Sequence, residues 1–352
     1  MNRILNILMR IKKNRKIISF VMVIGFYLII ELLIHTIGLS RLFTSMLVPC
    51  CCYIILALSL NLVVGFSGEL SLGHAGFMAI GAFTAVIVSG LTAQAIPNGL
   101  LRLFLSVICG SVLSGILGLI ISVPVLKLSG DYLAIVTLAF GQIIKSLITN
   151  IYMGFDDRGM QFSFVTNELN LNGGKMLLSG PMGATDTAKI SNFSSGVFLI
   201  VVTLFVIYSL IESRYGRAIM SARDDRIAAE SIGIDISRTK TLAFVVSAII
   251  SGASGALYAL NYSTLQPAKF DFNTSILALV YVVFGGLGNI NGTIIATMVL
   301  YVLPELLRSL QDYRMLIYAV VLIIVMQLTN STKVKQYLEK MRKMIFRKGE
   351  NV

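Results

Sequence analysis

Ten apolar segments alternate with polar connections along this chain of 352 residues. An α-helix rises about 1.5 Å per residue, so about 20 apolar residues cross the hydrocarbon core of a bilayer. The pattern predicts an all-α integral membrane protein with about ten transmembrane helices, because a spanning helix satisfies its own backbone polar groups. The expected spans are 18–36, 42–64, 70–91, 101–126, 131–151, 194–212, 241–262, 273–289, 291–309 and 313–329.

Two features of this pattern have more than one interpretation. The eighth and ninth spans are short and are joined by Gly285-Gly286-Leu287-Gly288-Asn289. One of these two spans can be re-entrant, provided that protein surrounds its backbone. The first span follows a basic stretch, as the apolar region of a signal peptide does. It is longer than such a region usually is, and no A-x-A site follows, so we expect it to be retained.

Clusters of positive charge predict the orientation of the chain. Of 29 Lys and Arg residues, 19 fall in three places, namely six within 1–17, six within 213–240 and seven after Leu328. Short cytoplasmic segments carry an excess of such residues, and ten spans put all three clusters on that side. The expected divisions are a basic cytoplasmic N-terminus at 1–17, a transmembrane domain at 18–329 with an extracytoplasmic loop at 152–193 and a cytoplasmic loop at 213–240, and a basic cytoplasmic tail at 330–352.

Composition excludes several classes of protein. The chain is 56% hydrophobic and 13% charged, which is typical of a polytopic membrane protein. Its net charge of +12 follows the topology, so we expect attraction to anionic membrane lipid and no binding of nucleic acid. The four cysteines lie within apolar spans and have neither metal-ligand nor disulfide spacing, so we expect no metal and no cofactor. They are Cys50, Cys51, Cys52 and Cys109.

Motifs for nucleotide binding and covalent catalysis are missing from the sequence. The nearest approach to G-x-x-x-x-G-K-[ST] is Gly173-Gly174-Lys175-Met176, which lacks the hydroxyl residue and a preceding strand. Neither H-E-x-x-H nor G-x-S-x-G occurs, and no pair of carboxylates shares a span. We therefore expect that this chain is not an enzyme and has no ATPase site of its own.

A charged island at 212–240 separates the sixth and seventh spans and contains a short helix. Asp224 is expected to cap this helix, residues 225–232 to form it, and Gly233 to end it. At about 13 Å the helix is too short to cross a bilayer. It carries Ile227 and Ile232 beside charged residues. Such a helix is typical of a membrane subunit that presents itself to a soluble partner.

Polar residues within or near the spans are candidates for a translocation route, because ionisable groups are costly inside a membrane. Glu69 follows a glycine-rich connector and can instead lie at the membrane interface. His74 also has two interpretations, a histidine satisfied by helix contacts or one that lines the route. The candidate route residues are Asn61, Glu69, His74, Thr137 and Gln142.

Two further patterns concern packing and the outer face. Small residues at four-residue spacing predict faces on which helix backbones approach closely. The polar segment 152–193 has two interpretations, a solvated loop or a partially ordered cap that receives an extracellular partner. The two small-residue stripes are Gly110, Ser114 and Gly118, and Ser247, Ser251, Gly255 and Ala259.

Four motifs, in order along the chain, resemble those of branched-chain amino acid ABC permeases. The first is the N-L-x-x-G-x-x-G-x-x-S-L-G-H-A signature, and it is similar to Asn61-Leu62 followed by Gly65, Gly68 and Ser71-Leu72-Gly73-His74-Ala75. Residues 130–138 resemble a signature of the LivM-like branch. The coupling loop of that branch resembles Gly216-Arg217-Ala218 with 228–234. The fourth motif matches Gly285-Gly286-Leu287-Gly288 followed by Gly292.

The resemblance covers about residues 50–330 and implies a subunit of an ATP-driven importer in a bacterial cytoplasmic membrane. It implies a fold like that of type II ABC importer permeases, and transport of branched-chain or similar small hydrophobic amino acids by alternating access. The implied partners are a second homologous permease, two ATP-binding cassette subunits and an extracytoplasmic substrate-binding protein. The residues implied to couple to the ATPase are Arg217, Asp225, Ala229, Glu230 and Gly233.

Alternatives to this interpretation remain. Related permeases carry urea or short amides, and this chain carries nothing that excludes such cargo. An ion-coupled secondary amino acid transporter would need charged or broken-helix sites near the midplane, and only His74 and the glycine-rich turns offer them. A membrane-embedded enzyme is disfavoured by the missing catalytic motifs. The chain departs from the family in the extracytoplasmic segment. Family members often have a compact T-G-G-P-x-G motif there, whereas in this chain Gly173-Gly174 and Gly180-Pro181-Met182-Gly183 are separated.

Overall fold

The computed structural model describes residues 2–37, 41–126, 128, 130–156, 159–164 and 174–307, and also 316, 319, 320 and 323. Most of the expected tenth span at 313–329 and the whole tail at 330–352 lie outside these residues. The chain divides into two compact units, Met1–Thr297 and Met298–Val352. The contacts given below are those of the first unit.

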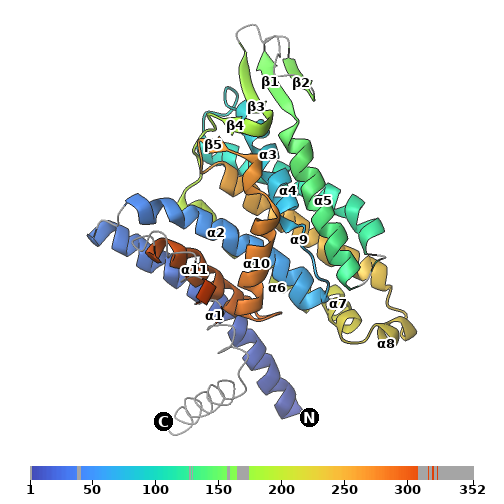
Figure 1. Cartoon of the computed structure of the whole chain (residues 1–352). Helices are drawn as coiled ribbons and strands as arrows, with labels where there is room; N and C mark the ends of the chain where they lie inside the picture. Colours follow the sequence, from blue (N-terminus) through green and yellow to red (C-terminus); the bar gives the residue numbers. More distant parts are fainter. Residues whose placement is uncertain are drawn as a thin grey trace. The chain divides into compact units, whose positions relative to one another are not determined.

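The described residues are mainly helical, as the apolar pattern predicts (Figure 1). Among the described residues, eight helical segments are long and apolar enough to cross a membrane, and a further apolar helix is shorter. The helices are α1 (Asn2–Ile37), α2 (Arg41–Asn61), α3 (His74–Leu91), α4 (Gly99–Val125), α5 (Asp131–Thr149), α6 (Phe193–Glu212), α7 (Arg214–Asp224), α8 (Arg226–Ser231), α9 (Ile236–Ala259), α10 (Phe272–Gly285) and α11 (Ile290–Leu306).

Helix boundaries differ from the expected spans at several positions, for example at the starts of α3 and α9. Two further differences concern the first and the eighth span. The basic stretch before the first span belongs to the same helix, since α1 runs without a break from Asn2 to Ile37. The eighth span ends at Gly285 because Gly286 and Gly288 both have positive φ, at 90° and 74°, which breaks the helix. The turn between α10 and α11 is therefore built by glycine, as the sequence indicated.

The small-residue stripes lie where α3, α4 and α9 pack together. A Cβ added at Gly252 of α9 would come within 2.5 Å of the Ser114 Cβ and 2.9 Å of the Gly110 carbonyl oxygen, both on α4. A Cβ at Gly110 would in turn lie 2.8 Å from the carbonyl oxygen of Gly81 on α3. The Ser114 hydroxyl donates to the Phe77 carbonyl oxygen at 2.7 Å. The prediction of packing faces is confirmed, with backbone against backbone and small hydroxyls bonded across the seam.

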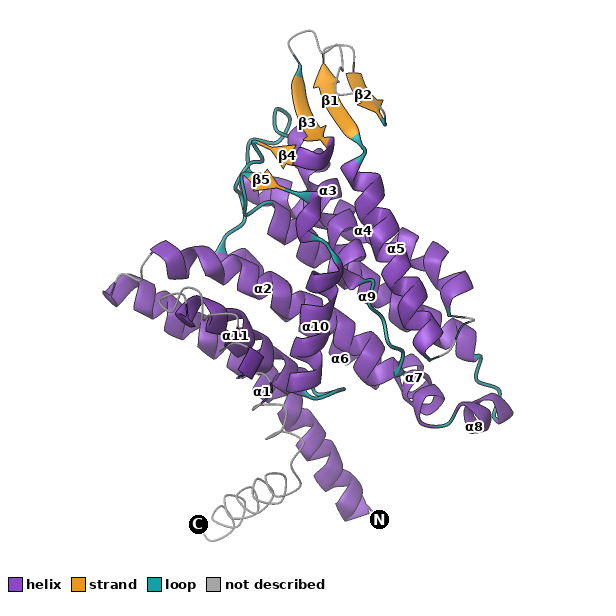
Figure 2. Cartoon of the chain, in the orientation of Figure 1, coloured by secondary structure: helices purple, strands orange, loops and turns teal. Residues whose placement is uncertain are grey.

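Strands occupy part of the polar segment between α5 and α6 (Figure 2). β1 (Tyr152–Asp156) lies between β2 (Gly159–Ser163) and β3 (Lys175–Ser179), and β4 (Ala184–Thr185) pairs with β5 (Thr264–Leu265). All of these pairings are antiparallel. Of the two interpretations of this segment, a partially ordered cap agrees with its described residues. In Figure 1 the strands and α8 lie at opposite ends of α5 and α9.

Candidate functional site

The charged island forms two consecutive helices before α9 begins. Ser213 caps α7 by accepting a hydrogen bond from the Gly216 amide at 3.2 Å, and Asp225 caps α8 by accepting from the Ala228 amide at 3.0 Å. The prediction that Asp224 caps the short helix is therefore wrong by one residue, because Asp224 is the last residue of α7. The helix itself is also shorter than expected and ends at Ser231. Gly233 follows with φ 85°, a conformation that favours glycine after a helix end.

A small apolar core holds the island together. Ala222 of α7, Ala229 of α8 and Ile236 of α9 are buried against one another, and Ile234 packs on them. Ala229 is 0% exposed. Ala229 therefore lies on the buried face of α8 and presents no side chain to a partner.

The outer surface of α8 is apolar at two positions. Ile227 of α8 and Ile232, the residue that directly follows α8, are 81% and 74% exposed. Between them Glu230 receives a hydrogen bond from the Arg226 Nε at 3.1 Å. An isolated exposed isoleucine is ordinary, but one on this six-residue helix and another directly after it, beside an ion pair, form an amphipathic surface suited to a protein partner.

The other expected coupling residues shape the island. Arg217 donates from Nη1 to the carbonyl oxygen of Glu212 at 3.0 Å and so holds the joint between α6 and α7. Gly233 has no atom of a neighbouring residue within 4 Å of an added Cβ, so its backbone conformation and not crowding demands glycine. Among the five coupling candidates, Glu230 presents a charged side chain on the surface of α8, while Asp225 acts as the cap.

The candidate route residues lie at several places in the first unit. Asn61 is buried, where Oδ1 accepts from the Gly288 amide at 2.9 Å and Nδ2 donates to the Thr293 hydroxyl at 3.0 Å. The Thr137 hydroxyl accepts from the Leu72 amide at 3.0 Å and donates to the Ala134 carbonyl oxygen at 2.9 Å. These side chains therefore bind parts of the fold to one another.

His74 is buried with both ring nitrogens occupied. Nδ1 lies 3.1 Å from the Ser71 hydroxyl, and Nε2 lies 2.7 Å from the hydroxyl of Ser247 on α9. The rings of Phe77 and Phe244 pack edge-on against the imidazole. Of the two interpretations left open by the sequence, this geometry favours a histidine satisfied by helix contacts.

The remaining two route candidates, Glu69 and Gln142, lie in an ion pair and at a narrow cleft, respectively. Glu69 forms an ion pair with Lys240 near the start of α9, and both side chains are largely buried. Gln142 is half-buried and lines a narrow cleft between α3, α5 and α10, together with Gly76 and Ser275. The cleft has no room for a solute in this conformation. A route along it would have to open by relative movement of these helices.

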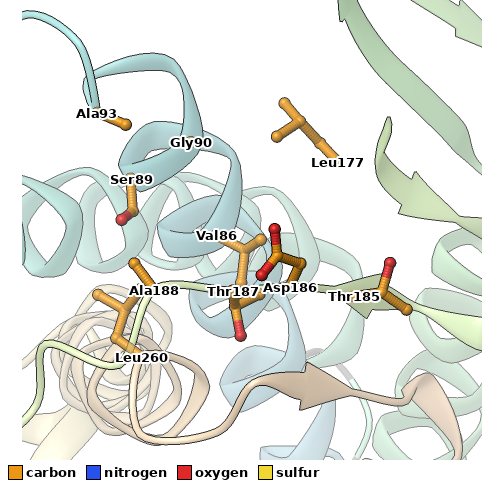
Figure 3. A pocket seen from close by; sticks show the side chains of 10 residues that line it. All are labelled: Val86, Ser89, Gly90, Ala93, Leu177, Thr185, Asp186, Thr187, Ala188 and Leu260. Carbon is orange, nitrogen blue, oxygen red and sulfur yellow. The ribbon is translucent and has the colours of Figure 1, made fainter. Parts of the chain in front are cut away.

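A second pocket lies near the strands, and polar side chains are among those that line it (Figure 3). It has a volume of about 100 Å³ and is lined by α3, by the segment that follows β4, and by Leu260. Ser89 lines it with a buried hydroxyl that has no hydrogen-bond partner in the described residues. Asp186 stands at its edge with φ 57°, a backbone conformation rare outside glycine. This pocket was not anticipated, because its residues are far apart in the sequence.

Two basic residues of the island, which the sequence marks only as signals of topology, have specific partners in the structure. Arg223 donates from Nη1 to the carbonyl oxygen of Gly65 at 3.0 Å, and Lys240 pairs with Glu69. No local pattern marks such partners. Among the described residues, no group of three or more His, Cys, Asp and Glu side chains is arranged to hold a metal ion.

Comparison with known proteins identifies the class. A family described as branched-chain amino acid transport system / permease component matches residues 42–326, and the chain belongs to this family. It is a multi-pass membrane protein of about ten transmembrane helices. The resemblance drawn from the four motifs is thereby confirmed.

Individual relatives agree in class but differ in named cargo. The high-affinity branched-chain amino acid transport system permease protein LivM of Salmonella typhimurium is 35% identical over 289 residues, which are 78% of this chain and 65% of LivM. The fructose import permease protein FruG of Bifidobacterium longum is 27% identical over 72% of this chain and 71% of its own length. The permease protein LivH of Escherichia coli is 24% identical over 70% of this chain and 79% of LivH.

This chain therefore spans less than two-thirds of the LivM relative. No solved structure matches the chain.

Proposed function

We propose that this chain is the permease subunit of an ATP-driven importer that moves branched-chain or similar small hydrophobic amino acids across a bacterial plasma membrane. Family membership supports the permease role, and the similarity to LivM supports the cargo. The exposed apolar surface of α8 is the observation that carries the coupling role. The chain would lack an ATPase site and would take its energy from partner subunits.

The proposed partners are two ATP-binding cassette subunits, a second homologous permease and an extracytoplasmic substrate-binding protein. One ATPase subunit would cover Ile227 and Ile232, and fully burying an isoleucine contributes about 1.5–3 kcal/mol. The ordered strands between α5 and α6 would receive the binding protein. This arrangement requires cytoplasmic termini and a cytoplasmic island. The placement of α8 and the strands at opposite ends of α5 and α9 in Figure 1 supports the cytoplasmic island.

Alternating access would be driven from the island. Closure of the ATPase subunits on ATP would displace α8, and the helices around the Gln142 cleft would move apart or together. ATP can shift this equilibrium only as far as it binds the two states with different free energies. The route need not hold substrate tightly, because the binding protein would supply the affinity. The chain would therefore need no large substrate pocket of its own, which agrees with the narrow cleft.

The relatives specify the transported substrate least, because LivM is named for branched-chain amino acids and FruG for fructose. Urea and short amides also remain as candidate cargo. The test is uptake of labelled leucine into proteoliposomes that contain this chain and its candidate partners, with and without ATP. ATP-dependent uptake blocked by unlabelled isoleucine or valine is the expected result. ATP hydrolysis stimulated by another solute would keep the machine and change the cargo, and uptake by this chain alone on an ion gradient would contradict the proposal.

Docking of α8 has its own test. Replacing Ile227 with serine removes exposed apolar surface without touching the buried core of the island, so binding of the ATPase subunit should weaken about tenfold, as expected for loss of about 1.4 kcal/mol. The matched control is Ile227→Leu, which keeps the apolar surface and should bind normally. Copurification of the ATPase subunit measures both variants. Equal binding by Ile227→Ser and the wild type would remove α8 as the docking surface.

A further inference from the structure

The charged island has polar contacts with a second region of the chain, and docking of a partner on α8 does not require these contacts. This region is the α2–α3 connector, residues 62–73, which comprises the π-helix η1 (Leu62–Ser67) and the loop that follows it. π-Helices are rare and occur often at functional positions. The connector has two polar contacts with the island. It also packs against Thr137 of α5 through Leu72 and Gly73, and against Gly288 in the turn after α10 through Gly65.

The first contact is made by Arg223, at the junction of α7 and α8. Its Nη1 donates to the carbonyl oxygen of Gly65 in η1 at 3.0 Å, and the last carbonyl groups of a helix lack partners within the helix. Its Nε and Nη2 donate to Asp224 at 2.9 and 2.7 Å, which fixes the guanidinium. Gly68 closes η1 with φ 76°, and a Cβ added there would lie 2.6 Å from the Arg223 Cγ. The connector is thus shaped around this arginine.

The second contact is the ion pair between Lys240 and Glu69. Their side chains are only 13% and 11% exposed, so the pair is shielded from water. Lys240 is the last residue of the island and lies near the start of α9, and Glu69 lies immediately after η1 and Gly68. The two contacts therefore hold both ends of this stretch of the connector.

The island can act on these contacts as one body. Ala222, Ala229 and Ile236 form a shared core of α7, α8 and the start of α9. A displacement of α8 is therefore passed through packed side chains to Arg223 on one side and toward Lys240 on the other. Close-packed groups transmit a displacement because they cannot deform freely.

The far side of the connector reaches the helices that line the Gln142 cleft. The Leu72 amide donates to the hydroxyl of Thr137 on α5, and the Ala75 amide donates to the hydroxyl of Ser275 on α10 at 3.1 Å. At the start of η1, Asn61 holds the Gly288 amide in the turn after α10. A movement of the connector would therefore act on α5 and α10 together.

We infer that Arg223 and the Lys240–Glu69 pair are positioning residues that carry displacement of α8 through the α2–α3 connector to the helices of the route. The inference rests on the proposed function and adds to it the residues that link the ATPase-facing surface to the cleft. Residues of the connector need not touch either ATP or substrate. Their removal should separate ATP hydrolysis from transport while leaving the docking surface intact.

A charge-swap cycle in the reconstituted transporter tests the ion pair. Glu69→Lys and Lys240→Glu should each retain ATP hydrolysis and lower leucine uptake per ATP by about tenfold, and the double variant Glu69→Lys/Lys240→Glu should recover most of the loss. A purely structural pair would change assembly and not the ratio of uptake to hydrolysis. Wild-type ratios in both single variants, or a double variant no better than the single ones, would overturn the inference.

Hydrogen exchange of the assembled complex tests Arg223 independently of uptake. In the wild type, trapping the ATP-bound state should change amide exchange in both 226–232 and 62–73. In Arg223→Ala the change at 226–232 should remain and the change at 62–73 should be lost. Arg223→Lys is the second variant, because one ammonium can still donate to the Gly65 carbonyl but cannot also hold Asp224 in a fork. It should show a reduced change at 62–73.

The two proposals fail in different ways. A wild-type chain that binds no ATPase subunit would contradict the proposed function. A wild-type complex that transports with ATP but shows no exchange change at 62–73 would overturn only the inference. The same conclusion would follow if Arg223→Ala kept the wild-type change at 62–73.

Discussion

The core of α3, α4 and α9 and the charged island differ in how they use small residues and charge. From Thr241 to Tyr262 the chain carries no Lys, Arg, Asp or Glu, and glycines let α9 touch its neighbours through backbone atoms. In the island, charged residues cap and pair the short helices, while isoleucines face outward. The core has its partners inside the chain, whereas the island has a surface left for a partner outside it.

This difference predicts which amino-acid substitutions the fold should tolerate. A close backbone seam has no room for a side chain, so substitutions there act on folding. The island is held by a small apolar core and by caps that contribute little each, so substitutions on its outer surface should act on coupling. The four predictions below run from the largest expected effect on stability to the smallest.

Gly255→Leu should break the core. A Cβ at Gly255 would overlap the carbonyl oxygen of Met78 on α3, so the larger side chain must push α3 and α9 apart. We expect a loss of about 3 kcal/mol in the free energy of unfolding. Thermal unfolding in detergent, followed by size-exclusion chromatography, measures it. Gly25→Leu is the control, because nothing lies within 4 Å of a Cβ there. Equal melting temperatures of the two variants would contradict the packing argument.

His74→Ala should also destabilise the core, though less. Its removal takes away the two hydrogen bonds of the ring, to Ser71 and Ser247, which costs about 1–3 kcal/mol. Melting temperature is the measurement. Ser89→Ala is the control, because the Ser89 hydroxyl has no partner in the described residues and should be dispensable. If transport fell in His74→Ala while the melting temperature did not, His74 would belong to the route.

Asp225→Ala should weaken α8 alone. The variant loses the side chain that accepts from the Ala228 amide, which costs about 1 kcal/mol of helix stability. Hydrogen exchange at 226–232 should rise about fivefold for such a loss, and the melting temperature of the whole chain should hardly change. Asp225→Asn keeps a good capping residue and should exchange as the wild type does. Faster exchange in both variants would show that charge and not capping matters here.

Glu230→Lys should leave stability almost unchanged and still abolish coupling. The exposed pair with Arg226 contributes at most about 1 kcal/mol, but the substitution puts two positive charges on the proposed docking surface. ATPase activity of the complex should no longer respond to the binding protein. Asp235→Asn is the control, since it removes an exposed acidic charge that is paired with Arg238 but keeps a residue able to cap α9. Retained coupling in Glu230→Lys would remove this residue from the interface.

Local patterns were sufficient for much of the fold. The apolar segments predicted the helices, and the spacing of Gly110, Ser114 and Gly118 predicted a packing face, because both depend on the period of one helix. The island helix was also predicted, although its cap was placed on Asp224. Adjacent aspartates both suit a cap, and only the path of the backbone decides between them. The strands between α5 and α6 were missed because their pairing depends on residues outside each strand.

The sequence by itself determined the class of protein, the number and type of most spans and the existence of a charged, amphipathic island. These properties follow from hydrophobic length, helical period and motif order, which are local or ordered along the chain. Tertiary structure alone decided the partners of His74, the ion pair of Glu69 with Lys240 and the contact of Arg223 with Gly65. The last two join residues 171 and 158 positions apart. Such a long-range polar contact forms only after helix packing has brought the two groups together and has excluded the water that competes for them.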